Sequence, residues 1–348
     1  MLTTIRNSLN SSRRAAQVAA VGALALLALV TTLAGCGTSA NGVGGGSVKL
    51  TVGLTYVPNI QFAPFYAAQA LGYYRDAGLD VTFHHHGASE DEFGALVAGQ
   101  EDAIFASGDE IAGARAHNVP IVDVATVFTR YPVVVIVPAN SSIQSAADLR
   151  GHTIGVPGAY GATYIGLLSL LASAGLSKND VTIQSIGYTQ VTALLSHKVD
   201  AVMGYANNEP LLLKKAGMDV RTLDVNNAEH PLVSNGLAAM EPELAAHGDA
   251  ITRLVAATLK GVDYVLAHPQ EAVNLSKQFV PGLSDASASA DALAVLQATL
   301  PYMQTVDGKA GYNDPAKWSG MVSFLQAQGQ LAGPVDATKA YSNKYLPS

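Results

Sequence analysis

The chain has a single cysteine, Cys36, among its 348 residues. An intrachain disulfide needs two cysteines and a cysteine-type zinc site needs several, so neither can form. Charged residues are only 14% of the chain, against about 25% in an ordinary globular protein. Hydrophobic residues make up 49%. This composition excludes a disordered chain, and the length is enough for about two domains.

An excess of positive charge is also absent, because the formal net charge is -7. Nucleic acid phosphates require a basic face, so we expect no nucleic-acid partner. The sequence contains no G-x-S-x-G, H-E-x-x-H or G-x-x-x-x-G-K-[ST] pattern. We therefore expect no catalytic residues, no cofactor and no enzyme activity.

The N-terminal residues resemble an export signal. Arg6, Arg13 and Arg14 precede an Ala- and Leu-rich run from 18 to 33, which is the order of an export signal's charged and apolar regions. The run ends in Leu-Ala-Gly-Cys36, which matches the lipobox of bacterial lipoproteins. We expect residues 1–35 to be removed and Cys36 to carry the lipid; the alternative is a plain secretory signal with a free thiol. The Gly- and Ser-rich residues up to 47 predict a flexible tether, 36–47.

Strand and helix patterns alternate along the rest of the chain. Apolar, β-rich segments predict strands at 48–56, 79–84, 103–106, 131–138, 153–156, 181–186 and 201–205. Periodic segments predict helices at 62–71, 90–98, 161–174 and 192–196, and the residues from 241 to 326 are largely helical. This alternation predicts two α/β lobes, each a mostly parallel sheet covered by helices on both faces.

Two segments of the chain look alike. Residues 95–107 and 193–205 both run from a helix through an Asp-Ala turn, at Asp102 and Asp200, into a short apolar strand. Each strand then opens into a small polar loop. Ligands of open α/β sheets bind beyond the carboxyl ends of the strands. If the two lobes face each other, both loops border one cleft.

Several of these segments resemble a known family. The string Tyr56-Val-Pro-Asn59, the helix at 62–71 with its Gly-Tyr-Tyr end, the residues 77–81 and the segment 148–156 are similar to periplasmic substrate-binding proteins of ABC importers. The branch includes binders of thiamine pyrimidine precursors, riboflavin and alkanesulfonates. The resemblance implies a two-lobed (type II) periplasmic-binding-protein fold, with lobe 1 at 48–132 and 237–348 and lobe 2 at 133–236. It also implies crossing strands near 131–138 and 233–240.

The resemblance further implies a monomer, lipid-anchored outside the cell membrane, that delivers its ligand to permease and ATPase subunits. Tyrosines recur where predicted strands open into loops, which favours a ring-binding cleft. The polar residues of the same loops are mainly amides and carboxylates, which suit the edge of a heterocycle. The predicted ligand-binding residues are Tyr56, Asn59, Gln61, Phe62, Ser107, Glu110, Tyr131, Tyr160, Tyr164, Tyr188, Gln190, Tyr205, Asn207, Asn208 and Glu209.

The ligand class follows from the charges near these loops. Arg130 is the cationic residue that lies next to them, whereas a sulfonate, nitrate or phosphate would be expected to recruit Arg or Lys. We therefore expect a thiamine pyrimidine precursor or riboflavin, with a small anion as the alternative. Glu209 is expected to orient the ring between Tyr56 and Tyr205, in a segment held extended by Pro210. A pyrimidine-synthase-like enzyme is not supported, since that resemblance requires a Cys-rich iron motif.

The triplet His84-His85-His86 is the remaining motif. Neighbouring strand residues point to opposite faces, so at most His84 and His86 share one face. The sequence shows no carboxylate set near them to complete a metal site. We therefore expect no metal, and interpret the triplet as a solvated strand end.

Overall fold

The computed structural model describes residues 47–87, 90–305 and 308–347. The predicted signal, Cys36 and almost all of the tether lie outside these residues, so their roles stay predictions. In the part of the chain that is described, no helix is both long and apolar enough to cross a membrane.

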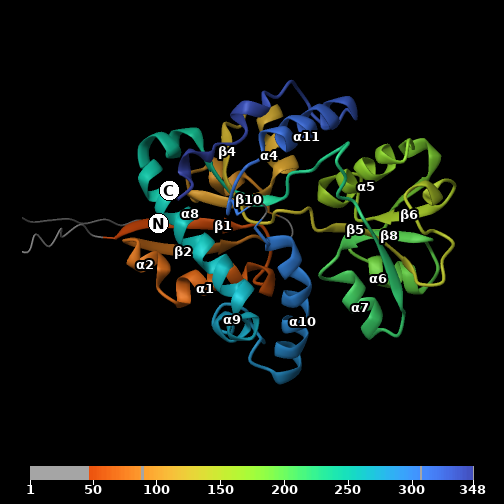
Figure 1. Ribbon diagram of the computed structural model, residues 1–348, viewed down its shortest axis with the longest axis horizontal. Helices are drawn as coiled ribbons and strands as arrows, with labels where there is room; N and C mark the ends of the chain where they lie inside the picture. Colours follow the sequence, from red (N-terminus) through yellow and green to blue (C-terminus); the bar gives the residue numbers. More distant parts are fainter. Residues whose placement is uncertain (1–46, 88–89, 306–307, 348) are drawn as a thin grey trace, which may run out of the picture. The chain divides into compact units, whose positions relative to one another are not determined.

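The first and last parts of this chain build one five-stranded sheet, sheet A (Figure 1). Its strands, in the spatial order β2-β1-β3-β10-β4, are β1 (Val48–Leu54), β2 (Leu79–His85), β3 (Ala103–Ser107), β4 (Ile121–Thr126) and β10 (Asn235–Met240). β10 is antiparallel to both of its neighbours, and the other strands run parallel to one another. Sheet A is therefore mostly parallel, as expected.

The middle of the chain builds sheet B with the same plan. Its strands, in the order β7-β6-β8-β5-β9, are β5 (Val133–Pro138), β6 (Thr153–Val156), β7 (Thr182–Ser185), β8 (Ala201–Tyr205) and β9 (Val220–Asp224). Here β5 is the antiparallel strand. The apolar run of β5 follows from burial of both faces: Val133 and Val135 pack on the side of α5, and Val134 and Ile136 on the side of α6 and α7.

Helices flank both sheets, as predicted (Figure 1). The helices before residue 240 are α1 (Ala63–Ala70), α2 (Tyr73–Asp76), α3 (Gly94–Val97), α4 (Gly108–Ala116), α5 (Gly161–Ser173), α6 (Gln190–Leu195) and α7 (Glu209–Lys215). Those after it are α8 (Glu241–Ala267), α9 (Pro269–Ser276), α10 (Ala286–Met303) and α11 (Pro315–Ala327). Short 3-10 turns lie at Ile60–Phe62, Ala147–Leu149, Lys178–Asp180, Ala337–Lys339 and Asn343–Tyr345.

Two strands and three helices were not predicted from the sequence. β4 carries the buried Asp123 in its middle and β9 is half-exposed, whereas β10 lies in the crossing strand expected at 233–240. The helix α4 begins directly after β3, where we expected a polar loop, and α7 begins at Glu209, after the short loop 206–208 that follows β8. The short helix α2 follows the helix predicted at 62–71. The predicted helix at 90–98 is confined to α3. These errors share one cause: short elements carry little periodicity of their own.

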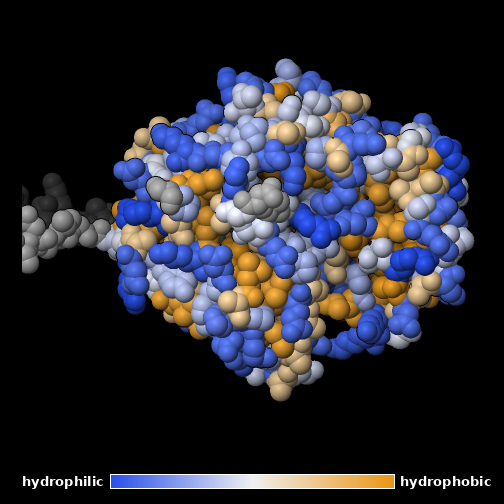
Figure 2. All heavy atoms as spheres, viewed as in Figure 1, coloured by the Kyte–Doolittle hydropathy of each residue, from blue (hydrophilic) through white to orange (hydrophobic). Residues whose placement is uncertain are grey.

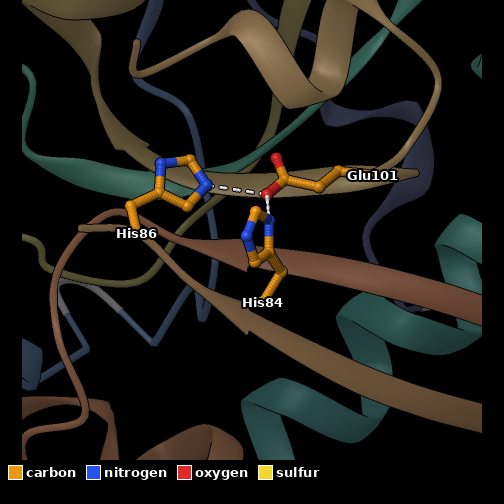
Figure 3. Close-up of side chains that lie close together, drawn as sticks. All are labelled: His84, His86 and Glu101. Carbon is orange, nitrogen blue, oxygen red and sulfur yellow. Dashed lines mark hydrogen bonds and ion pairs between the residues drawn. The ribbon is translucent and has the colours of Figure 1, made fainter. Parts of the chain in front are cut away.

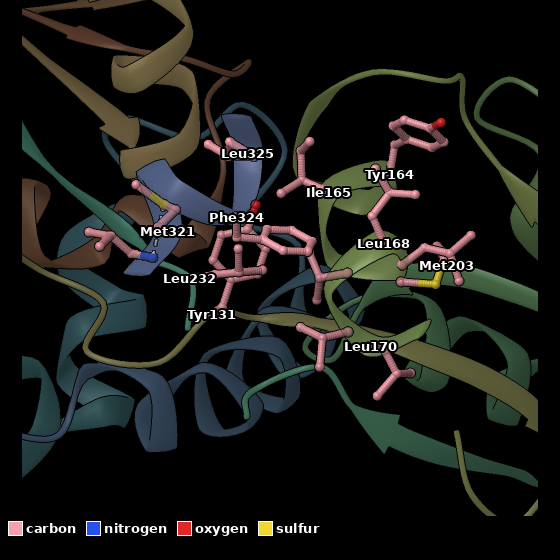
Figure 4. Packing of buried hydrophobic residues seen from close by; sticks show 14 of the residues in the cluster. Tyr131, Tyr164, Ile165, Leu168, Leu170, Met203, Leu232, Met321, Phe324 and Leu325 are labelled. Atoms are coloured by element: carbon pink, nitrogen blue, oxygen red, sulfur yellow. Dashed lines mark hydrogen bonds between the residues drawn. The ribbon is translucent and has the colours of Figure 1, made fainter. Parts of the chain in front are cut away.

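Two of the buried hydrophobic clusters contain most of the contacts between the sheets and their helices. One lies between sheet A and the helices α1 and α8, and includes Val52, Phe65 and Leu254. The other joins α5 to α11 beside Tyr131 (Figure 4). In it, Ile165 and Leu168 of α5 share one cluster with Phe324 and Leu325 of α11, which is a late element in the sequence.

The chain passes between the two sheets twice. It leaves β4 at Thr126 and enters β5 at Val133, and it leaves β9 at Asp224 and enters β10 at Asn235. The crossing segments are therefore 127–132 and 225–234. They overlap the crossing strands expected at 131–138 and 233–240 only at 131–132 and 233–234, because the rest of each expected segment lies inside strand β5 or β10.

Candidate ligand-binding site

The predicted ligand-binding residues follow the carboxyl ends of parallel strands in both sheets. Tyr56, Asn59, Gln61 and Phe62 follow β1, and Ser107 ends β3 with Glu110 in the first turn of α4. In sheet B, Tyr160 and Tyr164 follow β6, Tyr188 and Gln190 follow β7, and the residues from Tyr205 to Glu209 end β8 and begin α7. This is the edge at which open α/β sheets bind ligands.

Tyr131 reaches the same edge from an antiparallel strand. β5 begins where β8 ends, with Val133 paired to Tyr205, and Ala206 N donates to Pro132 O at 2.9 Å. The hydroxyl of Tyr131 donates to Asp109 Oδ1, in the first turn of α4, at 2.8 Å. A residue on the crossing segment thus connects the end of β8 in sheet B to α4, which follows β3 of sheet A.

Acidic side chains lie near Tyr131 and Tyr205. Burial, followed by the charge of Glu110, raises the pKa of Asp109 to about 7. Burial and the neighbouring Glu110 also raise the pKa of Glu92 well above its usual value. The pKa of Tyr205 is raised by burial and then by the charges of Glu110, Asp109, Glu209 and Glu92. We call these residues the acidic–tyrosine cluster: Glu92, Asp109, Glu110, Tyr131, Tyr205 and Glu209.

Glu110 and Glu209 of this cluster also accept hydrogen bonds from the nearby backbone. Glu110 Oε2 accepts from the backbone N of Ser107 at 2.9 Å and from its Oγ at 2.6 Å, and so completes a capping box. Glu209 Oε2 accepts from Tyr205 N at 2.7 Å, and its Oε1 accepts from Asn208 Nδ2 at 3.2 Å. Glu209 is buried. The carboxylates are thus held in fixed positions beside the strand ends.

Glu209 is not in the extended segment that we expected. It is the first residue of α7, and Pro210 lies in the first turn of that helix. The reason is that proline is compatible with a helix N-terminus, where no intrahelical partner for its missing N–H is needed. The restraint that proline places on the preceding residue does not prevent this arrangement.

The similarity between residues 95–107 and 193–205 is confirmed in three dimensions. Asp102 Oδ2 accepts from Thr51 N at 2.6 Å, and Asp102 N donates to Thr51 O at 2.9 Å. Asp200 makes the equivalent pair with Thr153 at 2.8 Å and 2.9 Å. In both sheets this pair of hydrogen bonds joins the turn before one strand, β3 or β8, to the neighbouring strand, β1 or β6. The next helix begins at Gly108 in sheet A and at Glu209 in sheet B.

The aromatic residues divide into two groups by burial. Tyr56, Tyr160 and Tyr188 are 52%, 65% and 80% exposed, so their rings are free to contact a ligand. Phe62, Tyr131 and Tyr164 are buried in the core, and Tyr205 is half-buried. The ring of Phe62 packs against Phe105 and His85 and offers little surface to a ligand.

The amide side chains of Asn59 and Asn207 make structural hydrogen bonds. Asn59 Oδ1 accepts from Gln61 N at 3.1 Å and starts the short turn before α1. Gln190 is buried at the beginning of α6. Asn207 Nδ2 donates to Thr299 Oγ1 of α10 at 2.8 Å. That bond joins the loop after β8 to α10, and Figure 2 shows the surface hollowed where α10 approaches α7.

Arg130 does not offer a free positive charge to an anion. Its guanidinium pairs with Asp224 at the end of β9 and lies over the ring of Tyr302, 5.5 Å from the centroid. A cavity of about 270 Å³ beside the carboxyl end of β4 contains Lys309 and Lys317, but none of the predicted ligand-binding residues lines it. The acidic–tyrosine cluster therefore suits a ligand with N–H donors better than an anion.

Sequence reasoning missed two members of this cluster, Glu92 and Asp109. Asp109 belongs to the polar string directly after β3, and only its contact with Tyr131 distinguishes it. Glu92 lies in the loop before α3 and carries no local signal. The interpretation of His84 and His86 as a solvated strand end is wrong, because both rings contact the buried carboxylate of Glu101 (Figure 3).

Comparison with known proteins agrees with this architecture. The chain is 37% identical over 309 residues to riboflavin-binding protein RibY of Chloroflexus aurantiacus, covering 86% of each chain. It is 27% identical over 332 residues to the formylaminopyrimidine-binding protein of Halalkalibacterium halodurans, covering 92% of this chain and 97% of that protein.

The fold matches solved structures as well. The periplasmic aliphatic sulphonate binding protein SsuA of Escherichia coli superimposes with a TM-score of 0.66 at 17% identity, covering 84% of this chain and 91% of that one. At this identity the match shows a shared fold, that of periplasmic binding proteins. Residues 59–272 match the NMT1/THI5-like family. With this match and the 37% identical relative, the chain belongs to the NMT1/THI5-like family.

Proposed function

We propose that the protein is the extracytoplasmic solute-binding component of an ABC importer and that it captures riboflavin. The acidic–tyrosine cluster at the carboxyl ends of β3 and β8 is the observation that carries this proposal. The relative named for riboflavin binding, at 37% identity, supports the choice of ligand. A protein that carries a small molecule needs a binding site and two lobes that close over the ligand, but it needs no catalytic group.

The chemistry of the cluster fits the isoalloxazine ring. The pyrimidine edge of that ring presents an N–H donor between two carbonyl acceptors. An ionised carboxylate accepts from the N–H, and a carboxyl kept protonated by its raised pKa, such as Asp109, donates to a carbonyl. The exposed rings of Tyr56, Tyr160 and Tyr188 provide flat partners for the rest of the ring system.

A thiamine pyrimidine precursor is the second candidate, favoured by the relative named for formylaminopyrimidine binding. Its amino groups would donate to the same carboxylates. It is much smaller than riboflavin and would leave some of the exposed tyrosines without a partner. A sulfonate or nitrate fits less well, because Arg130 is already paired with Asp224.

We also propose that the protein acts as a lipid-anchored monomer with no enzyme activity. Cys36 would carry the acyl chains, and residues 36–47 would tether the binding unit near its permease and ATPase partners. A pyrimidine synthase of the same family is the enzymatic alternative. The single cysteine of this chain leaves no Cys-rich motif for such chemistry.

Titration with riboflavin, followed by its fluorescence and by thermal unfolding, tests the proposal. A ligand at 100 times its dissociation constant stabilises the folded state by about 2.7 kcal/mol, which is readily detected. Formylaminopyrimidine, thiamine, taurine and nitrate serve as competitors. An unchanged melting temperature with riboflavin would refute riboflavin as the ligand. An unchanged melting temperature with every one of these compounds would refute the proposed ligand class.

Ring variants test the position of the site. Loss of a ring partner costs about 0.5–1.5 kcal/mol beyond buried area. Tyr160→Ala and Tyr188→Ala should therefore each weaken binding by about 2- to 12-fold. Tyr73→Ala is the control, because Tyr73 is a partly exposed tyrosine of α2, which leads into the start of β2 and so lies at the opposite edge of sheet A. Equal effects of all three substitutions would remove the assignment.

A further inference from the structure

His84, His86 and Glu101 form a compact group in sheet A (Figure 3). His84 Nδ1 lies 2.6 Å from Glu101 Oε1, and His86 Nε2 lies 2.7 Å from the same oxygen. One donor atom from each residue lies within 4.8 Å of the others. We call these three residues the His–Glu cluster.

Strand geometry explains why these two histidines and not His85 meet the carboxylate. His84 and His86 point to one face of the chain, and His85 points to the other, toward Tyr66 and Phe62. Glu101 lies in the turn before β3, and β1 separates β2 from β3 in the sheet. The carboxylate lies over β1 at Gly53, which is paired with His84.

The glycine at position 53 leaves room for the carboxylate of Glu101. A Cβ at position 53 would lie only 2.6 Å from Glu101 Oε1, so any residue other than glycine would displace the side chain. Glu101 is only 3% exposed, and its Oε2 is buried with no hydrogen-bond partner in the described residues. A buried carboxylate with an unpartnered oxygen is costly unless another group neutralises it.

We propose that the His–Glu cluster binds one divalent transition-metal ion, best matched by Zn²⁺. Two imidazole nitrogens and one carboxylate oxygen are a common zinc donor set, with bonds of about 2.0–2.2 Å. Nitrogen and oxygen ligands at such distances lie somewhat farther apart than the present contacts, so small side-chain rotations admit the ion. The ion takes the place of the N–H hydrogens that now point at Oε1, and a water completes the tetrahedron.

The surroundings suit such a site. The side chain of His84 is 39% exposed, which gives the ion a path from solvent. His84 Nε2 lies 3.4 Å from Glu90 Oε1, and a carboxylate on the outer ring nitrogen orients a metal-binding histidine. His85 Nδ1 contacts the backbone oxygen of Tyr56 at 3.2 Å. A bound ion would therefore fasten the end of β2 beside the loop that carries Tyr56.

Zinc titration of the full chain tests the site. The protein is purified in detergent without a histidine tag, stripped with EDTA, and titrated with Zn²⁺ by calorimetry, with metal content measured after dialysis. One ion per chain and an increase in melting temperature are expected. A metal content far below one ion per chain after dialysis, or an unchanged melting temperature, would overturn the proposal.

Variants assign the ion to these residues. His84→Gln and Glu101→Gln should each weaken zinc affinity by at least about 10-fold, since even outer partners of metal ligands contribute about 10- to 100-fold. His152→Gln is the matched control, because His152 is a half-exposed histidine paired with Asp200. Loss of zinc binding in the control as well, or full binding in both ligand variants, would refute the assignment.

A spectroscopic measurement guards against variants that simply misfold. X-ray absorption of the zinc-loaded wild-type protein should show two imidazole nitrogens together with oxygen ligands. A shell of oxygen alone would overturn the proposal. Circular dichroism of each variant before titration shows whether the sheet has formed, and only folded variants are compared.

Discussion

The hydroxyl of Tyr131 donates a 2.8 Å hydrogen bond to the carboxylate of Asp109 in the buried interior. Tyr131 lies on the first segment that passes between the sheets, and Asp109 begins the helix after β3. The bond therefore fastens the crossing segment to sheet A at the edge where we place the ligand. The two groups also affect each other's pKa, because the bond from Tyr131 lowers the pKa of Asp109 and the charge of Asp109 raises the pKa of Tyr131.

Tyr131→Phe removes this hydrogen bond and should destabilise the protein by about 1–3 kcal/mol. The cost should be larger at pH 8 than at pH 5, because the pKa of Asp109 is about 7 and a bond to an ionised carboxylate is the stronger one. Urea unfolding at both pH values measures it. Tyr74→Phe is the matched control, since Tyr74 pairs with neutral Thr258 and its cost should not vary with pH.

Asp123 should make the protein less stable as the pH rises. Burial raises its pKa from 3.8 to about 7. The folded state then binds more protons than the unfolded state between these values, so its stabilising contribution is complete below about pH 4 and is lost as the pH rises through about 7. In Asp123→Asn this part of the slope should disappear from unfolding measurements between pH 5 and 8. An unchanged slope would contradict the assignment.

Asn207 should matter for ligand affinity through its contact with α10. Its bond to Thr299 is buried, and a buried hydrogen bond contributes about 0.5–1.5 kcal/mol, so Asn207→Ala should weaken binding by about 2- to 12-fold. Lys215→Ala breaks an exposed pair with Asp291 in the same region and should have little effect. Calorimetry compares the two, and equal losses would argue against this role for Asn207.

Closure on the ligand is a related prediction. The two crossing segments, 127–132 and 225–234, are where the chain can bend without breaking either sheet. Small-angle scattering of the full chain in detergent should show compaction on ligand binding after the micelle signal is matched out. An unchanged radius at saturation would mean that binding occurs without closure.

Lipid anchoring is tested by Cys36→Ser. Acyl chains contribute about 0.8 kcal/mol per buried methylene, so two or more chains hold a protein firmly on a membrane. The variant should therefore leave the membrane fraction once its signal is cleaved. A cleaved Cys36→Ser protein that remains in that fraction would show that something other than the lipid holds it there.

Much of the architecture could be predicted from local patterns. The strands β6 and β8 have the predicted boundaries, and the repeated unit around Asp102 and Asp200 is visible in the order of residue types alone. The tyrosine and amide residues that follow the strand ends also predicted at which edge of the sheets the candidate ligand-binding residues lie. Such features depend on side-chain periodicity and turn residues that are neighbours in the sequence.

The contacts between distant residues were decided only by the tertiary structure. Phe62 and Tyr56 follow the same strand, yet one is buried and the other is exposed, because the core accommodates one ring and not the other. The His–Glu cluster exists because the sheet order places β1 between β2 and β3 and leaves the space over Gly53 for Glu101. Likewise Asp109 meets Tyr131 because the segment that crosses from β4 to β5 passes beside the first turn of α4. A sequence determines which segments form strands, but side chains become neighbours through the order of those strands, which depends on packing of the whole chain.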